Sequence, residues 1–268
     1  MSLSPQPRDV MRLIFWFMLL CSFARAMPPI NDGAIHGDPP FLLEPGWTPL
    51  LNGQDLSGWR LQDPGKGAWS VTAGVFWDGV ANPKVLTALP APGDRLVNGA
   101  TGGSSNIVTT GRYGDIELYL EFLLAAKSNS GVYVQGLYEI QILDSYGVTK
   151  LKFGDCGGIY TRSVDGKLFG GQPPLVNASR PPGHWQSFHL WFRAPRFDAQ
   201  GRKIAEARFL RVLHNGVLVQ EDQEVDGPTH SAMPIPEAAE NPIMLQGDHG
   251  PVAYRNIYVR PLRPLAKP

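Results

Sequence analysis

A short loop near the C-terminal end of the sequence places two titratable side chains next to each other. Asp248 and His249 are consecutive, and glycines flank them in the run 245–250 (LQGDHG). Glycine lets a backbone approach a ligand closely, and histidine gains or loses a proton near neutral pH. The pair is therefore a candidate for general acid–base chemistry, whereas an isolated histidine is more often structural.

A third ionisable candidate, Glu139, lies in the run 138–144 (YEIQILD), where apolar and polar residues alternate. A period of two predicts a strand on which Glu139 and Gln141 share one face, opposite the apolar residues. A retaining glucanase on a similar sandwich needs two carboxylates about 5–5.5 Å apart. Gln141 and Leu143 stand where the second carboxylate would be. Ordinary endoglucanase chemistry is therefore not expected from this strand, and Glu139 remains a single candidate acid or base.

Four other side chains are candidates for binding a polar ligand. The amides of Asn129 and Gln246 suit sugar hydroxyls, although the stretch that starts at Asn129 also has the composition of a turn. Tyr160 can either stack on a sugar ring or pack in the core. Arg255 can either stabilise an oxyanion or form a structural ion pair with Asp248 or Glu139.

Carboxylates and imidazoles also bind metals, so a divalent ion at Glu139, Asp248 and His249 stays an open alternative. Their spacing matches no recognised set of metal ligands. The sequence therefore does not decide whether a cofactor is needed.

The elements that position these residues are expected to be strands. The chain contains 30 glycines and 25 prolines at short intervals, which excludes long helices. Strand patterns occupy 115–122, 131–144 (two runs), 186–193, 205–213, 217–220 and 252–260. The alternation in 115–122 predicts one face that lies in the core and one that does not, and Asn215-Gly216 predicts a tight hairpin. We expect about ten to thirteen strands in an all-β, two-sheet antiparallel β-sandwich.

Four segments in order carry a family resemblance. They are 50–59 (LLNGQDLSGW), 129–134 with 138–144 (NSGVYV and YEIQILD), 156–160 (CGGIY), and 245–250 with 254–257 (LQGDHG and YRNI). Together they resemble the 3-keto-disaccharide hydrolase family, which is built on a concanavalin-like jelly roll. The inserted Gly247 and the long, proline-rich stretch 161–180 depart from the family pattern, which affects loop geometry rather than the fold.

The resemblance implies cleavage of glycosides that carry a ketone at carbon 3. Such a ketone acidifies the C2 proton, so the reaction needs a base, a group that stabilises the enolate oxygen and an acid for the leaving group. Within this family His249 becomes the preferred base, with Glu139 as the alternative and Asp248 beside them. The expected substrate-binding residues are Gln141, Asn129, Tyr160, Gln246 and Arg255.

A second function class stays open, because the same fold often carries binding without chemistry. A non-catalytic carbohydrate-binding or laminin-G-like module would present a flat aromatic platform. Convergence of Glu139, Gln141 and His249 in one place would instead favour the enzyme.

The N-terminus has the features of an export signal. Arg8 and Arg12 precede the apolar run 13–20, and Ala24-Arg25-Ala26 fits a cleavage site. We expect a signal peptide (1–26), an extended lead-in (27–45), one jelly-roll domain (46–262) and a C-terminal tail (263–268). The mature protein would be periplasmic or extracellular, without a stable membrane span.

Charge and composition point to a neutral partner. The 24 basic residues balance the 24 acidic ones, so no nucleic acid or other polyanion is expected. The expected partner is a carbohydrate, an oxidised disaccharide or glucoside by the family resemblance.

Overall fold

The computed structural model describes residues 44–67 and 69–263. The expected signal peptide, nearly all of the lead-in and most of the tail lie outside the described residues, and the domain boundaries stay a prediction. All regular elements in the described part are strands. No helix suited to spanning a membrane occurs among the described residues.

The larger of two main sheets has eight strands. Their order is β17-β16-β13-β8-β19-β6-β3, and β1 pairs with β19. The strands are β1 (Thr48–Pro49), β3 (Ser70–Thr72), β6 (Arg95–Val97), β8 (Ile116–Leu124), β13 (Gln186–Arg193), β16 (Ala207–His214), β17 (Val217–Val225) and β19 (Val252–Pro261).

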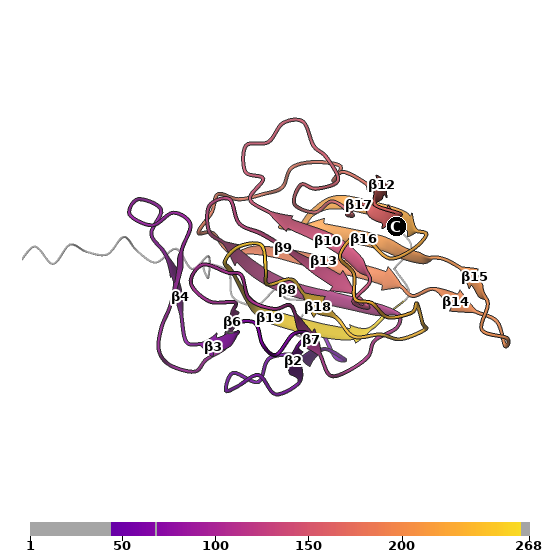
Figure 1. Cartoon of the computed structure of the whole chain (residues 1–268), viewed down its shortest axis with the longest axis horizontal. Coiled ribbons are helices and arrows are strands. Elements are labelled where there is room, and N and C mark those ends of the chain that lie inside the picture. The colour runs from indigo at the N-terminus through magenta and orange to yellow at the C-terminus, as the bar shows by residue number, and fades with distance from the viewer. Residues whose placement is uncertain (1–43, 68, 264–268) are drawn as a thin grey trace, which may run out of the picture. The chain divides into compact units, whose positions relative to one another are not determined.

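The smaller sheet has five strands in the order β10-β9-β18-β7-β2. They are β2 (Trp59–Leu61), β7 (Ile107–Thr109), β9 (Asn129–Val134), β10 (Tyr138–Leu143) and β18 (Met244–Leu245). Figure 1 shows the strands of the two sheets overlaid, and apolar side chains from both sheets form one core cluster. Strand neighbours in both sheets are antiparallel, which confirms the expected jelly-roll sandwich.

Three short hairpins raise the number of strands above the expected range. They are β4 (Val75–Trp77) with β5 (Leu86–Ala88), β11 (Arg162–Val164) with β12 (Lys167–Phe169), and β14 (Arg196–Phe197) with β15 (Lys203–Ala205). Strands of two or three residues are too short to show a period in the sequence. The predicted Asn-Gly hairpin is confirmed, since Asn215 and Gly216 have φ angles of 51° and 79° between β16 and β17.

Strand β8 has one face in the core cluster and one face outside it, as predicted, but all nine of its residues are buried. Glu117 and Glu121 point away from the core, and arginines neutralise both. Arg260 Nε lies 2.6 Å from Glu117 Oε2, and Arg255 Nε lies 2.6 Å from Glu121 Oε2. A polar alternation therefore marks a buried layer of ion pairs here rather than a solvated surface.

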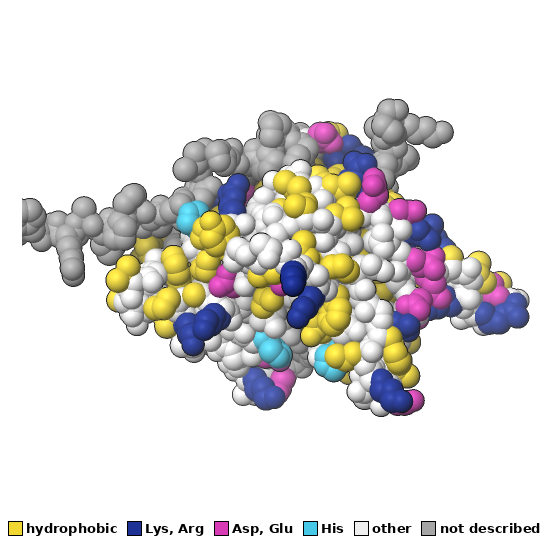
Figure 2. Space-filling model, turned by 90° about the horizontal axis from the view of Figure 1, so that it is seen from above, with side chains coloured by type: hydrophobic (Ala, Val, Ile, Leu, Met, Phe, Trp, Pro, Cys, Tyr) yellow, Lys and Arg dark blue, Asp and Glu magenta, His cyan; other side chains and the backbone are white. Residues whose placement is uncertain are grey.

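Charges on the surface are mixed. Figure 2 shows basic and acidic side chains scattered over the visible face. This distribution agrees with the balanced charge of the sequence.

Candidate functional site

The candidate site is built on the outer face of the five-stranded sheet, the face turned away from the core. In β10, Ile140 and Ile142 enter the core cluster. Glu139 and Gln141 therefore share the outer face, as predicted. On β9, Tyr133 lies opposite Glu139, and Gly131 lies opposite Gln141.

Gly131 makes room for the Glu139 side chain. A Cβ atom at position 131 would overlap Glu139 Oε1 and crowd the rest of that carboxyl group. The Glu139 carboxyl therefore leans across β9, above the backbone of Gly131. The glycine in the NSGVYV segment is explained by this close approach rather than by a turn.

Burial changes the acidity of Glu139. The residue is 2% exposed, and burial raises the pKa of its carboxyl to about 8. The negative charge of Asp248 raises the pKa further, whereas a hydrogen bond with Tyr133 lowers it. Glu139 thus holds its proton through neutral pH, and its ionised form is a stronger base than an ordinary carboxylate.

Two tyrosines flank Glu139 across the sheet. Tyr133 lies opposite Glu139 on the neighbouring strand β9. On the other side of β10, the bridge between Ile140 and Ile159 places Tyr160 opposite Glu139. Tyr160 N also donates to Glu139 O at 3.1 Å. Burial, followed by the charge of Glu139, raises the pKa of Tyr133 well above its ordinary value, so its hydroxyl remains a neutral donor. Tyr160 lies at the site, as predicted. Tyr133 was not predicted to lie there, although it stands two residues after Gly131 and therefore on the same face of β9.

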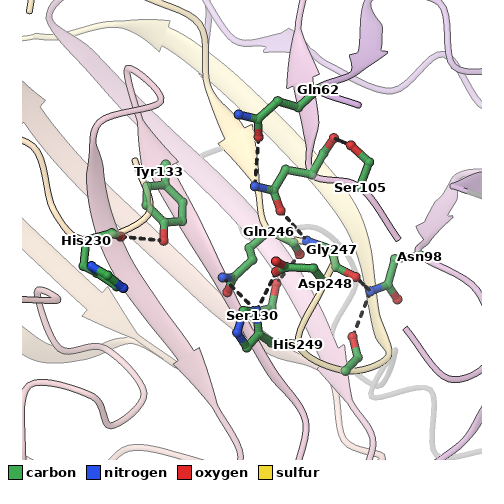
Figure 3. A network of polar contacts seen from close by, with 12 residues as sticks. Gln62, Asn98, Ser105, Ser130, Tyr133, His230, Gln246, Gly247, Asp248 and His249 are labelled. Atoms are coloured by element: carbon green, nitrogen blue, oxygen red, sulfur yellow. Dashed lines mark hydrogen bonds and ion pairs between the residues drawn. The ribbon is translucent and has the colours of Figure 1, made fainter. Parts of the chain in front are cut away.

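The predicted acid–base pair forms the second part of the site. His249 Nδ1 lies 2.6 Å from Asp248 Oδ1 and 3.3 Å from Gln246 Nε2. The side chains of Asp248 and His249 are 50% and 53% exposed. Figure 3 shows this group beside Ser130 of β9. The chain segments of Glu139 and His249 are thus brought together, as the enzyme hypothesis requires.

A buried amide, Asn98, fixes the loop that carries this pair. Its Nδ2 donates to Gly247 O at 2.9 Å and to Gly250 O at 2.8 Å, and its Oδ1 accepts from Val252 N at 2.8 Å (Figure 3). From the other side, Asn129 N donates to His249 O at 3.2 Å. The backbone on both sides of Asp248 and His249 is therefore held in place. Asn98 has no sequence signal, because its partners lie about 150 residues away.

Several predicted binding residues surround the Glu139 carboxyl. Gln246 N donates to Gly131 O at 3.0 Å, which places Gln246 next to Gly131. Within the described chain, the buried atoms Gln246 Oε1 and Asn129 Oδ1 have no hydrogen-bond partner. Gln141 Oε1 accepts from Ile142 N at 3.0 Å. A buried acceptor without a partner is costly, and a sugar hydroxyl would satisfy it.

Arg255 is the predicted site residue that the structure places elsewhere. It lies on β19 in the other sheet, where it pairs with Glu121 and its Cζ lies 4.3 Å from the Trp185 ring centroid. Both roles predicted for Arg255, stabilising an oxyanion at the site or pairing with Asp248 or Glu139, are therefore wrong. The odd-even pattern of the sequence cannot tell which of two sheets a strand joins.

The structure gives no metal-binding cluster in the part of the chain that it describes. No group of three or more His, Cys, Asp or Glu side chains there could hold an ion. The arrangement is instead one of proton-transfer groups and amides.

Comparison with known proteins gives the following matches. Residues 46–260 match the sequence profile of the 3-keto-alpha-glucoside-1,2-lyase-like domain. A candidate glycosyl hydrolase of known structure from Parabacteroides distasonis is 27% identical with a TM-score of 0.58, over 81% of this chain and 84% of that chain. Two more candidate glycosyl hydrolases from the same organism also match over 81% of this chain. One is 16% identical with a TM-score of 0.51 over 94% of its own chain, and the other is 23% identical with a TM-score of 0.50 over 99% of its own chain. At these identities they show the fold alone. No functionally curated protein matches the chain.

Proposed function

Because the chain belongs to the family of 3-keto-alpha-glucoside-1,2-lyase-like domains, we propose that it cleaves glycosides whose sugar carries a ketone at carbon 3. Members of this family are carbohydrate-active hydrolases or lyases. The observation that carries the finer proposal is a buried carboxyl, Glu139, whose pKa is raised to about 8 and which lies close to the Asp248–His249 pair.

The proposed reaction starts at carbon 2 of the oxidised sugar. Glu139 in its ionised form takes the C2 proton, and the electron pair moves toward the C3 ketone to form an enolate. The enolate then expels the C1 substituent, so that the C1–O bond breaks and a C1=C2 double bond forms. Water adds across this double bond, which gives net hydrolysis.

The raised pKa of Glu139 suits this step, because a C2 proton next to a ketone is a weak acid and needs a strong base. We assign the neutral hydroxyl of Tyr133, which donates to His230 O at 3.2 Å in this structure, as the group that turns to donate a hydrogen bond to the enolate oxygen. This division of roles reverses the order expected from the sequence, in which His249 was the preferred base.

His249 is the proposed acid for the leaving group. Its side chain is half exposed, and the contact between its Nδ1 and Asp248 Oδ1 at 2.6 Å orients the imidazole toward the site. The rest of the keto sugar would be held by the unpartnered acceptors Gln246 Oε1 and Asn129 Oδ1.

One observation favours a second candidate, ordinary glycoside hydrolysis. Although the strand of Glu139 carries no second carboxylate, the loop brings Asp248 close enough to raise the pKa of Glu139. Ordinary glycosidases also use two carboxyl groups, one of which has a raised pKa. An unoxidised substrate separates the two candidates.

The test compares 3-keto-trehalose with trehalose, using purified wild type and Glu139→Gln. We expect wild type to cleave only the keto sugar and Glu139→Gln to lose a factor of about 10² to 10⁴ in kcat. Cleavage of trehalose itself would favour the second candidate. Binding of either sugar without cleavage would instead favour a carbohydrate-binding module.

We also propose that the protein is exported and that the segment 1–26 is removed. N-terminal sequencing of protein recovered from the periplasm or the medium should give a chain that starts at Met27. An intact N-terminus in the cytoplasmic fraction would contradict export.

A further inference from the structure

A line of amide side chains crosses the outer face of the five-stranded sheet, from the candidate site to strand β2. Continuing the register of β18 and β7 places Asn106 opposite Gln246. Asn106 Nδ2 donates to Gln62 Oε1 at 3.0 Å, so Gln62 lies on the same face. We call Gln62, Asn106 and Gln246 the amide row, and Gln62 and Gln246 are labelled in Figure 3.

Hydrogen bonds to neighbouring groups fix the amide row. Asn106 Oδ1 accepts from Gly247 N at 3.0 Å, directly before Asp248. Because Gln62 Oε1 is engaged by Asn106, the orientation of the Gln62 amide is set. Gln62 is exposed, and its Nε2 has no partner among the described residues. An oriented donor that faces solvent pays less entropy on binding than a mobile one.

The row extends beyond the reach of a single sugar ring. The Glu139 carboxyl lies above Gly131 on β9, and β18, β7 and β2 follow in the sheet. Three steps of about 4.8 Å between neighbouring strands give roughly 14 Å from that carboxyl to Gln62. A ligand that touches both must therefore contain a second ring or an extended hydroxylated group.

We propose that Gln62 and Asn106 form a leaving-group subsite that binds a second sugar of the substrate. This inference rests on the proposed function, because the first sugar is the one whose C2 proton Glu139 removes. Amide groups match the hydroxyls of a sugar, so Gln62 and Asn106 select a sugar over an aromatic alcohol as the leaving group.

The opposite side of the site has a different character. There the segment that contains Tyr160 leads into the β11–β12 hairpin, where Leu168 and Phe169 are 55% and 41% exposed. An aromatic leaving group would pack against these side chains. The direction taken by the leaving group therefore distinguishes the two kinds of substrate.

The kinetic test uses 3-keto-trehalose and methyl 3-keto-glucoside with wild type, Gln62→Ala and the matched control Leu168→Ala. We expect Gln62→Ala to raise the KM for the disaccharide about three- to tenfold, the effect of one or two lost hydrogen bonds, and to leave the methyl glycoside unchanged. Leu168→Ala should change neither substrate by more than about twofold. Equal effects of Gln62→Ala on both substrates, or no effect on either, would overturn the subsite.

A binding measurement keeps this test separate from the proposed function. Cleavage of methyl 3-keto-glucoside by wild type depends only on the chemistry at Glu139, so its failure counts against the proposed function. The side-chain NH₂ signals of Gln62 and Asn106, followed by NMR, should shift when trehalose is added but not when methyl glucoside is added. Signals that stay unmoved by trehalose and by 3-keto-trehalose would refute the subsite, whether or not the protein is active.

Discussion

Replacing Glu139 by glutamine should stabilise the protein, and the gain should grow with pH. An ordinary glutamate has a pKa of 4.5, and burial, with a contribution from Asp248, raises that of Glu139 to about 8. Between these two values the folded protein holds a proton that the unfolded chain releases. Folding therefore becomes less favourable as the pH rises through this window, and Glu139→Gln removes the penalty.

The size of the effect follows from the two pKa values. Each unit of difference corresponds to about 1.4 kcal/mol once the unfolded chain is fully ionised. Integrated from pH 5 to pH 7, the wild type should lose about 2.5 kcal/mol of unfolding free energy relative to Glu139→Gln. The loss should continue to about pH 8, where the folded protein also begins to ionise.

Urea denaturation of wild type and Glu139→Gln at pH 5, 6, 7 and 8 measures this difference directly. Glu221→Gln, on an exposed position of β17, gives the background for the loss of a surface carboxylate. A gain from Glu139→Gln that is constant across these pH values, or no larger than that of Glu221→Gln, would refute the account of a buried, protonated Glu139. Because glutamine cannot act as a base, the stabilised variant should also be inactive.

Three other predictions follow from the same geometry. The pH profile of kcat/KM on a 3-keto substrate should have a rising limb with an apparent pKa near 8. Asp248→Asn, which removes a charge that raises the pKa of Glu139, should move this rising limb to lower pH, and an unmoved limb would contradict the coupling. Gly131→Ala should lower both kcat/KM and the free energy of unfolding measured in urea, the latter by about 1–3 kcal/mol, because the added methyl displaces the Glu139 carboxyl. A variant with wild-type values in both assays would show that the carboxyl has room. Glu121→Ala should lower the free energy of unfolding in urea by about 3–5 kcal/mol, because it leaves the buried guanidinium of Arg255 without its carboxylate. The double variant Glu121→Leu with Arg255→Met should recover most of this loss. A double variant as unstable as Glu121→Ala would refute the ion-pair explanation.

The sequence predicted the fold because the determinants of the sandwich are local. The alternation in β10 and the Asn215-Gly216 turn each reflect interactions between residues close in the chain, and the structure confirms both. The burial of the second face of β8 could not be predicted, for a non-local reason. Glu121 is buried because it pairs with Arg255, which lies more than 130 residues later in the chain. The alternation within one strand cannot predict such a distant partner.

The candidate site divides in the same way. Glu139 and the Asp248–His249 pair were recognisable as ionisable residues within distinctive segments, and the fold brings them together. Asn98 and Tyr133 were not recognisable from the sequence. Asn98 is hydrogen-bonded to a loop far along the chain, and Tyr133 lies opposite Glu139 only because of the strand register, so neither contact leaves a local pattern.

The buried glutamates Glu117 and Glu139 differ in whether neighbouring basic side chains compensate their negative charge. Burial would raise the pKa of Glu117, but His189 and Arg260 hold it below its usual range, so this charge is compensated in the folded state. Among the described residues, no arginine, lysine or histidine lowers the pKa of Glu139 in this way, and the charge of Asp248 raises it. A fold that neutralises one buried carboxylate but leaves another with a perturbed pKa beside an exposed histidine keeps an energetic cost that packing does not require. Deprotonation of a weak carbon acid is a reaction in which such a cost becomes an advantage, because the carboxylate that the fold disfavours is also the stronger base.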